Sequence, residues 1–198
     1  TLTPRLMRGR VSTDTSTHFM GQDFDCPFGI SPIGLQSLIW PGSEVALAQA
    51  AKVAGIPYTL STVAGASIEQ VAAVNDKTSW FQLYAPNDPE IMVDLLSRAK
   101  KAGMKTLIVT ADVPVPSRRE EMRYAGAPIG SRNPMAITPR VFWQSLLHPT
   151  WALSVLAHGG KFRFRNLEPY AEASALSNIS EFIGSQLNGS LTWDYLKD

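Results

Sequence analysis

The chain has 198 residues, a formal net charge of +1 and 44% hydrophobic residues. This composition is typical of a globular protein and excludes a chain that is disordered throughout. The near-neutral charge gives no argument for a nucleic-acid partner. The single cysteine, Cys26, cannot form an intrachain disulfide, which favours a reducing compartment such as the cytoplasm. We interpret Cys26 as a small residue before a strand.

The first elements in chain order are a short apolar strand over residues 28–33 and a helix that ends near Ala54. Ser43 is the predicted N-cap of this helix, and Glu44 lies in its first turn. Gly55 ends the helix, and Pro57 prevents it from resuming.

The same alternation of strand and helix continues to residue 110. A strand at Tyr58–Ser61 precedes a helix at Ile68–Val74 that Ser67 caps, and a third strand covers residues 80–83. Asp88 caps the next helix, which has Pro89 at its first position and runs to Ala102. A β-branched, apolar fourth strand at 106–110 is typical of a parallel sheet that is covered on both faces.

Four units of strand and helix predict an α/β fold with right-handed crossovers. The units fit either an open doubly wound sheet or about half of a TIM-type (β/α)8 barrel, which needs about 250 residues. We divide the chain into the N-terminal half of a barrel at 1–125, a long insertion at 126–190, and the start of a further helix at 191–198.

The insertion has an unusual composition. Residues 126–166 contain no Asp or Glu, and their basic residues alternate with aromatic ones. Helices are predicted at 141–147 and 151–157, separated by Pro149, with two more at 174–183 and after Thr192. Insertions of this length are usually functional or disordered.

Polar or small residues end all four predicted strands. They are Gly34, which directly follows Ile33, then Ser61, then Gln82 and Tyr84, and finally Thr110. The C-terminal ends of barrel strands form the active-site face. Any one of these residues fits an ordinary loop role, but four such strands in succession favour a shared pocket. We find no Gly-rich phosphate loop and no His/Cys cluster with metal-ligand spacing, so no metal is expected.

Several segments of the sequence together resemble those of a known family. The segments that carry the resemblance are Phe28-Gly-Ile-Ser-Pro-Ile-Gly, Tyr58-Thr-Leu-Ser-Thr, Trp80-Phe-Gln-Leu-Tyr, and Val109-Thr-Ala-Asp-Val-Pro with Arg118-Arg-Glu. Their order and spacing resemble the FMN-dependent 2-hydroxy-acid dehydrogenases and oxidases. The insertion, with Leu147-His-Pro-Thr-Trp and Arg165-Asn-Leu, is most similar to the mandelate and bacterial lactate dehydrogenases.

The resemblance implies a role for each matching residue. It implies that the backbone of Ile33 and Gly34 lies against the flavin of FMN. Ser61, Gln82 and Thr110 would hydrogen-bond the polar edge of the flavin ring. Tyr84 and Arg119 would contact the substrate, with the Arg119 guanidinium on its carboxylate.

The resemblance also implies an activity, the oxidation of an (S)-2-hydroxy acid to a 2-oxo acid. Gly34, Val63 and Pro116 leave room for a mandelate-like side chain. The catalytic histidine and lysine of the family are expected outside this chain, in a missing C-terminal half, so the chain alone is expected to be inactive.

Two further expectations concern partners. The insertion either docks on the inner membrane surface, as in the resembling branch, or packs over the barrel mouth or another subunit. A homo-tetramer is expected by analogy with the family. The alternative to an enzyme is a non-catalytic half barrel that binds a partner through its open edges.

Overall fold

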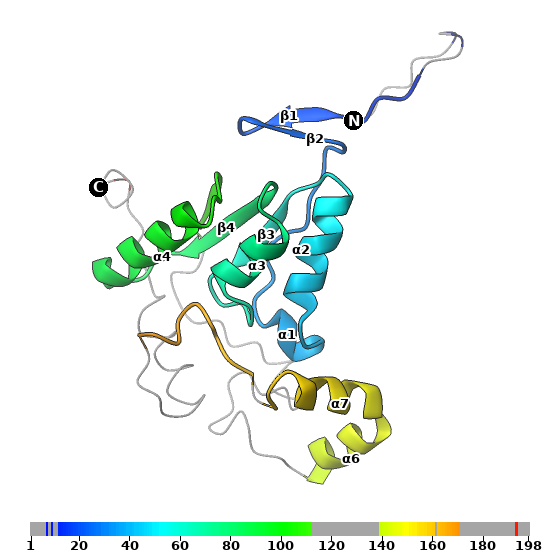
Figure 1. Ribbon diagram of the computed structural model, residues 1–198, viewed down its shortest axis with the longest axis vertical. Coiled ribbons are helices and arrows are strands. Elements are labelled where there is room, and N and C mark those ends of the chain that lie inside the picture. Colours follow the sequence, from blue (N-terminus) through cyan, green and yellow to red (C-terminus); the bar gives the residue numbers. More distant parts are fainter. Residues whose placement is uncertain are drawn as a thin grey trace.

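The computed structural model describes residues Met7, Gly9, 12–111, 139–160, 162–170 and Trp193. A hairpin of two strands lies at one end of the molecule, a parallel sheet with its helices lies in the middle, and a pair of helices lies at the other end (Figure 1). The predicted helices at 174–183 and after Thr192, as well as Pro116 and Arg119, lie outside the described residues.

The hairpin joins β1 (Thr17–Phe19) to β2 (Gln22–Phe24) in antiparallel register, with Phe19 opposite Gln22. The two turn residues, Met20 and Gly21, both have positive φ angles, of 51° and 72°. Two successive left-handed residues form the turn that best matches the twist of a two-stranded hairpin. The strands have only three residues each, and the sequence did not lead us to expect this hairpin.

The central sheet consists of β3 (Tyr58–Ser61), β4 (Ser79–Tyr84) and β5 (Leu107–Thr110), all parallel, in the order β3-β4-β5. The three strands predicted from Tyr58 onward are therefore confirmed within one or two residues. The strand predicted at 28–33 is wrong as a strand, because only Ile30 bridges to Tyr58. Pro27 directly precedes this segment and Pro32 lies within it, and neither has an N–H to donate to a ladder, which limits the pairing.

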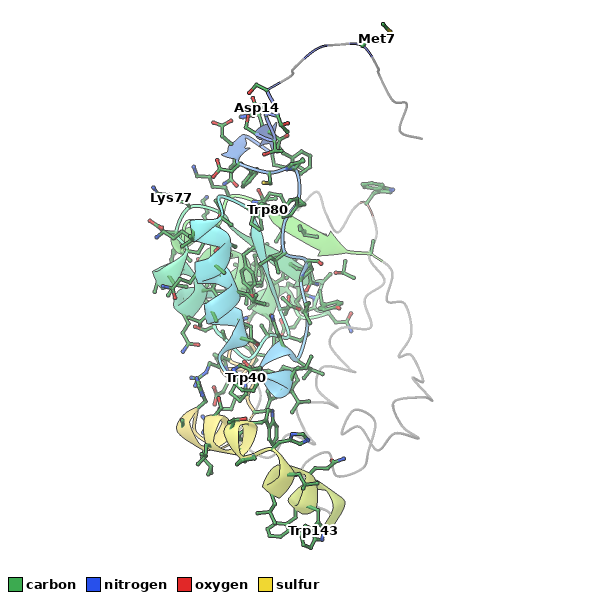
Figure 2. The ribbon with its side chains drawn as sticks, turned by 90° about the vertical axis from the view of Figure 1, so that its right-hand side faces the viewer. Met7, Asp14, Trp40, Lys77, Trp80 and Trp143 are labelled. Atoms are coloured by element: carbon green, nitrogen blue, oxygen red, sulfur yellow. The ribbon has the colours of Figure 1, made fainter. Side chains whose placement is uncertain are left out.

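The two faces of the sheet are different. Tyr58 and Leu60 of β3, with Phe81 and Leu83 of β4, pack into the apolar core beneath the helices. Because side chains alternate along a strand, Thr59, Ser61 and Gln82 lie on the opposite face. Figure 2 shows the helices on one side of the sheet, with Trp80 toward the hairpin and Trp40 toward the far end.

Four helices lie between or beside these strands. They are α1 (Gln36–Ile39), α2 (Ser43–Val53), α3 (Ile68–Val74) and α4 (Pro89–Lys101). Ser67 caps α3 in a complete capping box with Gln70, and Asp88 caps α4, so both predicted caps are confirmed. The helix α1 was not predicted, because four residues are too few to show a helical period.

The predicted N-cap of α2 is wrong. Gly42, in a left-handed conformation with φ 77°, occupies the cap position, and Ser43 is the first helical residue. The buried Ser43 hydroxyl has no hydrogen-bond partner among the described residues. Gly42 can adopt this conformation at little cost because it has no Cβ. Glu44 does lie in the first turn, but it points inward and is fully buried.

The described part of the insertion forms α6 (Pro139–Leu147) and α7 (Pro149–Ala157), which confirms both predicted helices. Pro149 does not simply separate them, since it is the first residue of α7, a position where its missing N–H costs nothing. Residues 162–170 then return to the sheet domain, where Phe164 and Leu167 join the core (Figure 1).

Candidate functional site

A chain of buried and partly buried hydrogen bonds crosses the C-terminal ends of the three paired strands. Ser61 Oγ donates to Gln82 Oε1 at 2.7 Å, and Gln82 Nε2 donates to Thr110 Oγ1 at 2.7 Å. Ser61 and Gln82 are also directly paired in the sheet register. Three of the residues predicted to contact one ligand are thus brought together in one row.

The backbone around Gln82 is fixed by Thr62. The Thr62 hydroxyl donates to the Gln82 carbonyl oxygen at 2.6 Å and accepts from the Tyr84 backbone N–H at 3.1 Å. Thr62 was not among the predicted site residues. Its position directly after Ser61 at a strand end is the signal that could have identified it.

The row has unused hydrogen-bonding capacity. Gln82 has a second amide N–H, and the Thr110 hydroxyl can still donate its own hydrogen. The Ser61 and Thr110 oxygens each keep one lone pair beyond those that accept from the Val63 N–H and from Gln82 Nε2. A flat heterocycle that offers both donors and acceptors along one edge fits such a row. These residues therefore suit the polar edge of a flavin, the cofactor that the resemblance implies.

The segment that contains Ile33 and Gly34 lies beside the end of β3. The Leu35 backbone N–H donates to the Val63 carbonyl oxygen at 3.1 Å. A Cβ on Gly34 would lie 2.8 Å from Val63 Cγ2, so only glycine allows this close approach. Leu35 has φ 60°, a strained conformation for a leucine that costs about 1–3 kcal/mol and needs support from its surroundings.

Tyr84 is the last residue of β4 and is half-buried. It lies two residues beyond Gln82, so both side chains leave the same face of the sheet. Tyr84 also pairs with Thr110 in the register of β4 and β5. Arg119, the other predicted substrate contact, lies outside the described residues.

Glu44 is a buried residue that the sequence analysis did not assign to the site. Its Oε1 accepts hydrogen bonds from the backbone N–H groups of Ser37, at 3.0 Å, and Gly65, at 2.9 Å. The Ser37 hydroxyl donates to its Oε2. Burial, together with the nearby Glu44 carboxylate, raises the pKa of Tyr58 well above its usual range.

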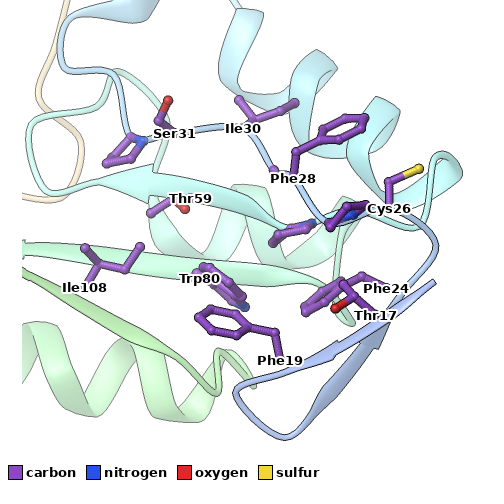
Figure 3. Close-up of a pocket in the computed structure, with 14 residues that line it drawn as sticks. Thr17, Phe19, Phe24, Cys26, Phe28, Ile30, Ser31, Thr59, Trp80 and Ile108 are labelled. Carbon is purple, nitrogen blue, oxygen red and sulfur yellow. The ribbon is translucent and has the colours of Figure 1, made fainter. Parts of the chain in front are cut away.

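A cavity of about 470 Å³ lies at the other end of the strands, on the face opposite the helices. Figure 3 shows the Phe19, Phe24 and Trp80 rings at one side of it, with Ile30, Thr59 and Ile108 further along. Cys26 lies at the edge of this cavity, after β2 and before the bridge at Ile30. The cavity is lined mainly by apolar side chains and lacks the polar row, so we do not assign the cofactor to it.

The histidines lie away from the polar row. His18 Nδ1 contacts Asp23 Oδ1 at 2.6 Å on the hairpin, and His148 directly precedes α7. The His158 ring fills the space where a Cβ of Gly42 would stand. Within the described residues, no group of three or more His, Cys, Asp or Glu side chains could hold a metal ion.

Comparison with known proteins identifies the class of protein to which the chain belongs. The sequence model of the FMN-dependent dehydrogenases matches residues 1–198. The chain therefore belongs to the FMN-dependent dehydrogenase family, a family of enzymes whose cofactor is FMN.

Among curated proteins, the chain is 36% identical to an L-lactate dehydrogenase of Ectopseudomonas mendocina (strain ymp) over 197 residues, which are 99% of this chain and 51% of that protein. It is 35% identical to an L-lactate dehydrogenase of Vibrio parahaemolyticus serotype O3:K6, again over 99% of this chain and 51% of the relative. The chain thus spans about half the length of the curated relatives it matches.

Among solved structures, the chain is similar to the monotopic membrane protein (S)-mandelate dehydrogenase. The TM-score is 0.80 at 32% identity, and the match covers 93% of this chain and 48% of that one. A mandelate oxidase matches with a TM-score of 0.59 at 36% identity, over 63% of this chain and 36% of its own.

Proposed function

We propose that the complete protein oxidises an (S)-2-hydroxy acid, mandelate-like or lactate-like, to a 2-oxo acid with FMN as the electron acceptor. The observation that carries this proposal is the row of hydrogen bonds from Ser61 through Gln82 to Thr110. The names of the relatives, lactate dehydrogenase and mandelate dehydrogenase, support the same substrate class.

We propose that the sheet is part of a closed (β/α)8 barrel. The three described strands are parallel and have helices on one face, as barrel strands do. The opposite face carries the polar row and the apolar cavity, and it would become the barrel interior. The remaining strands are expected in the other half of the complete protein, since the relatives are about twice as long as this chain.

Each site residue has a proposed task. Ser61, Gln82 and Thr110 hold the polar edge of the flavin, and the Ile33–Gly34 backbone lies along its ring. When bound, FMN accepts the two electrons and the hydrogen from the substrate. Tyr84 hydrogen-bonds the substrate from the end of β4, and Arg119 holds its carboxylate. The base that removes the hydroxyl proton and the family's lysine are expected outside this chain.

The experiment that tests this function is an anaerobic visible spectrum of the complete protein, before and after addition of (S)-mandelate or (S)-lactate. A yellow protein that bleaches with either acid is the expected result. A complete protein that binds no flavin would overturn the proposal and favour a non-catalytic interaction module.

A matched pair of variants tests which end of the sheet binds the cofactor. Thr110→Val removes a hydroxyl that accepts from Gln82, whereas Thr59→Val makes the same change on the same face near the opposite end. The first should weaken FMN binding by about tenfold, the equivalent of one or two lost hydrogen bonds. The second should leave FMN binding unchanged.

A second proposed function is docking of α6 and α7 on a membrane surface. The exposed apolar residues of this helix pair carry it, namely Phe142, Trp143, Leu146, Leu147, Leu153 and Leu156. Trp143 is 64% exposed, Leu147 73% and Leu156 69%, and a cluster of large apolar side chains this exposed is typical of an interaction surface. None of the described helices is long and apolar enough to cross a membrane, so we propose attachment to the surface.

The structure indicates which residues should be changed to test docking on a membrane. Trp151 donates from Nε1 to the Ile39 carbonyl oxygen at 3.0 Å, and Arg163 pairs with Glu168 at 2.7 Å, so neither is available as a simple surface anchor. The triple variant Trp143→Ser, Leu147→Ser and Leu156→Ser should no longer co-sediment with anionic liposomes. The double variant Val53→Ser and Val93→Ser, at exposed positions of α2 and α4, is the control.

Two outcomes oppose membrane docking. Co-sedimentation that persists in the triple variant would contradict membrane docking. A change in oligomeric state instead of liposome binding would assign these helices to a contact between subunits, and sedimentation analysis of the complete protein would also test the predicted homo-tetramer.

A further inference from the structure

Glu44 is the charged residue of the first turn of α2, yet it is fully buried. A carboxylate in that place gains from the helix dipole even when it is exposed to water. Burial removes the solvation by water and leaves only protein hydrogen bonds to compensate for its loss. A buried carboxylate therefore needs a set of donors, and the donors of Glu44 come from two different loops.

The first loop follows the bridge at Ile30 and contains Ile33, Gly34 and the short helix α1. It reaches Glu44 through Ser37, whose backbone N–H donates at 3.0 Å and whose hydroxyl donates as well. The second loop follows β3 and contains Thr62 and Val63. It reaches the same carboxylate through the Gly65 backbone N–H, at 2.9 Å.

The fit between the two loops at this point is tight. A Cβ on Gly65 would lie 2.6 Å from Ser37 Cβ and 3.1 Å from Glu44 Oε1. The loops are thus joined twice, once by the Glu44 carboxylate and once by the hydrogen bond from Leu35 N–H to the Val63 carbonyl oxygen. The second junction directly follows Gly34, at Leu35, where the backbone conformation is strained, and the first lies two residues further along, at Ser37.

We propose that Glu44 is a positioning residue for the flavin. Its carboxylate fastens the Ile33–Gly34 loop to the loop after Ser61 and thereby sets the distance between the two segments that contact the ring. This inference rests on the proposed function, because it assumes that the two loops hold FMN. Glu44 itself does not touch the cofactor.

The test uses two conservative changes in the complete protein. Glu44→Gln keeps the length of the side chain, retains an oxygen that accepts from both N–H groups, and presents an NH2 that can donate to the Ser37 hydroxyl. Glu44→Asp is shorter by one methylene and cannot reach both loops without movement of α2. Ser37→Ala is a milder variant that removes a single donor, and it serves if the aspartate variant does not fold.

Two controls separate positioning from general stability. Glu90→Gln makes the same change at the equivalent position of α4, where the glutamate is exposed. Asn75→Ala removes a fully buried side chain that bonds to the Ala48 carbonyl oxygen and to Thr78, away from both loops. Urea unfolding of each variant gives the loss of stability against which flavin binding is compared.

The readouts are the FMN dissociation constant and the visible absorption bands of the bound flavin. We expect Glu44→Asp to weaken FMN binding by about tenfold or more and to shift the bands, because the shorter side chain loses its hydrogen bond to one of the two loops. Ser37→Ala should act in the same direction. Glu44→Gln keeps the contacts to both loops, so its FMN affinity and absorption bands should remain close to those of the wild type. Asn75→Ala should lower stability without moving either.

Three results would overturn the inference. The first is an aspartate variant whose FMN affinity and absorption bands are unchanged, because the loops would then not depend on Glu44. If only Ser37→Ala folds, the same result in that variant has the same meaning. Equal weakening of FMN binding by Asn75→Ala at the same loss of stability would reduce Glu44 to a structural role. A wild-type protein that binds no FMN would refute the proposed function, and the inference with it.

Discussion

The fully buried side chain of Asn166 accepts a hydrogen bond from the backbone N–H of Ile68 at 2.9 Å, although the two residues are 98 positions apart. Ile68 is the first residue of α3, so its N–H has no partner within the helix. Arg98 adds a second contact, since its guanidinium donates to the Asn166 carbonyl oxygen at 3.2 Å. The segment that returns from the insertion is thus fixed to α3 and α4.

Replacement of Asn166 should release this returning segment. Asn166→Ala leaves the Ile68 N–H buried without its acceptor, which should lower the free energy of unfolding by about 1–3 kcal/mol. Hydrogen exchange measures the effect directly, and the Ile68 amide and residues 162–170 should lose protection first. Val93→Ala, at an exposed position of α4, is the control. Unchanged protection at Ile68 would contradict the assigned contact.

The pair of Arg98 and Glu69 should make stability depend on pH under acidic conditions. Arg98 Nε lies 2.8 Å from Glu69 Oε1, and this hydrogen bond lowers the pKa of Glu69 to about 2. The folded-state pKa lies below the unfolded one, so the stabilisation is present above about pH 4.5 and is lost as the pH falls toward 2. The Glu69 side chain is 56% exposed, which limits the effect to about 1 kcal/mol or less.

Urea unfolding of wild type and Glu69→Gln at several pH values checks this prediction. The difference between the two proteins should be largest near neutral pH and should shrink as the pH is lowered through about 4. A difference that stays constant over this range would show that the pair does not contribute through charge.

Gly34 and Val63 should be energetically coupled. Gly34→Ala places a Cβ 2.8 Å from Val63 Cγ2, and the overpacking should cost about 1–3 kcal/mol of stability and weaken FMN binding. Val63→Ala removes the clashing methyl group, so the double variant should regain part of both losses. A double-mutant cycle on FMN affinity and on unfolding measures the coupling. Purely additive effects would argue against the close approach of these residues.

The hairpin should depend on one side-chain hydrogen bond to the sheet. Trp80 Nε1 donates to Gln22 Oε1 at 3.0 Å, while the Phe24 ring packs edge-on against Trp80 with centroids 5.7 Å apart. Gln22→Ala should lower the free energy of unfolding by about 1 kcal/mol, because a buried indole N–H loses its acceptor. Gln144→Ala on the exposed surface of α6 is the control. Equal unfolding midpoints for the two variants would refute the prediction.

The sequence predicted the elements whose signals are local. Ser67 and Asp88 cap their helices as expected, because each side chain accepts from a backbone N–H only two or three residues further along the chain. The prediction failed at Ser43, where the preceding Gly42 takes the cap position and Glu44 turns inward to distant donors. Those donors lie on Ser37 and Gly65, and nothing near Glu44 in the sequence indicates that they will meet it.

Part of the site was also predictable. Ser61, Gln82 and Thr110 were expected to converge because the ends of neighbouring parallel strands meet at one edge, and the structure joins them by hydrogen bonds. Their contact with FMN stays a prediction. Thr62 and Glu44 were missed because both bind to backbone groups, Thr62 to those of β4 and Glu44 to those of the two loops. A residue that binds backbone groups is harder to identify from the sequence than a polar residue at a strand end.

The different surroundings of the five tryptophans make the protein its own optical probe. Trp80 is 8% exposed beneath the hairpin, whereas Trp40, Trp143 and Trp193 are 50%, 64% and 82% exposed. The emission of Trp80 should therefore be blue-shifted and poorly quenched by iodide, while that of Trp143 should be red-shifted and open to quenchers. A protein that keeps only Trp80 would report the opening of the hairpin. A protein that keeps only Trp143 would report a blue shift when α6 meets a lipid surface.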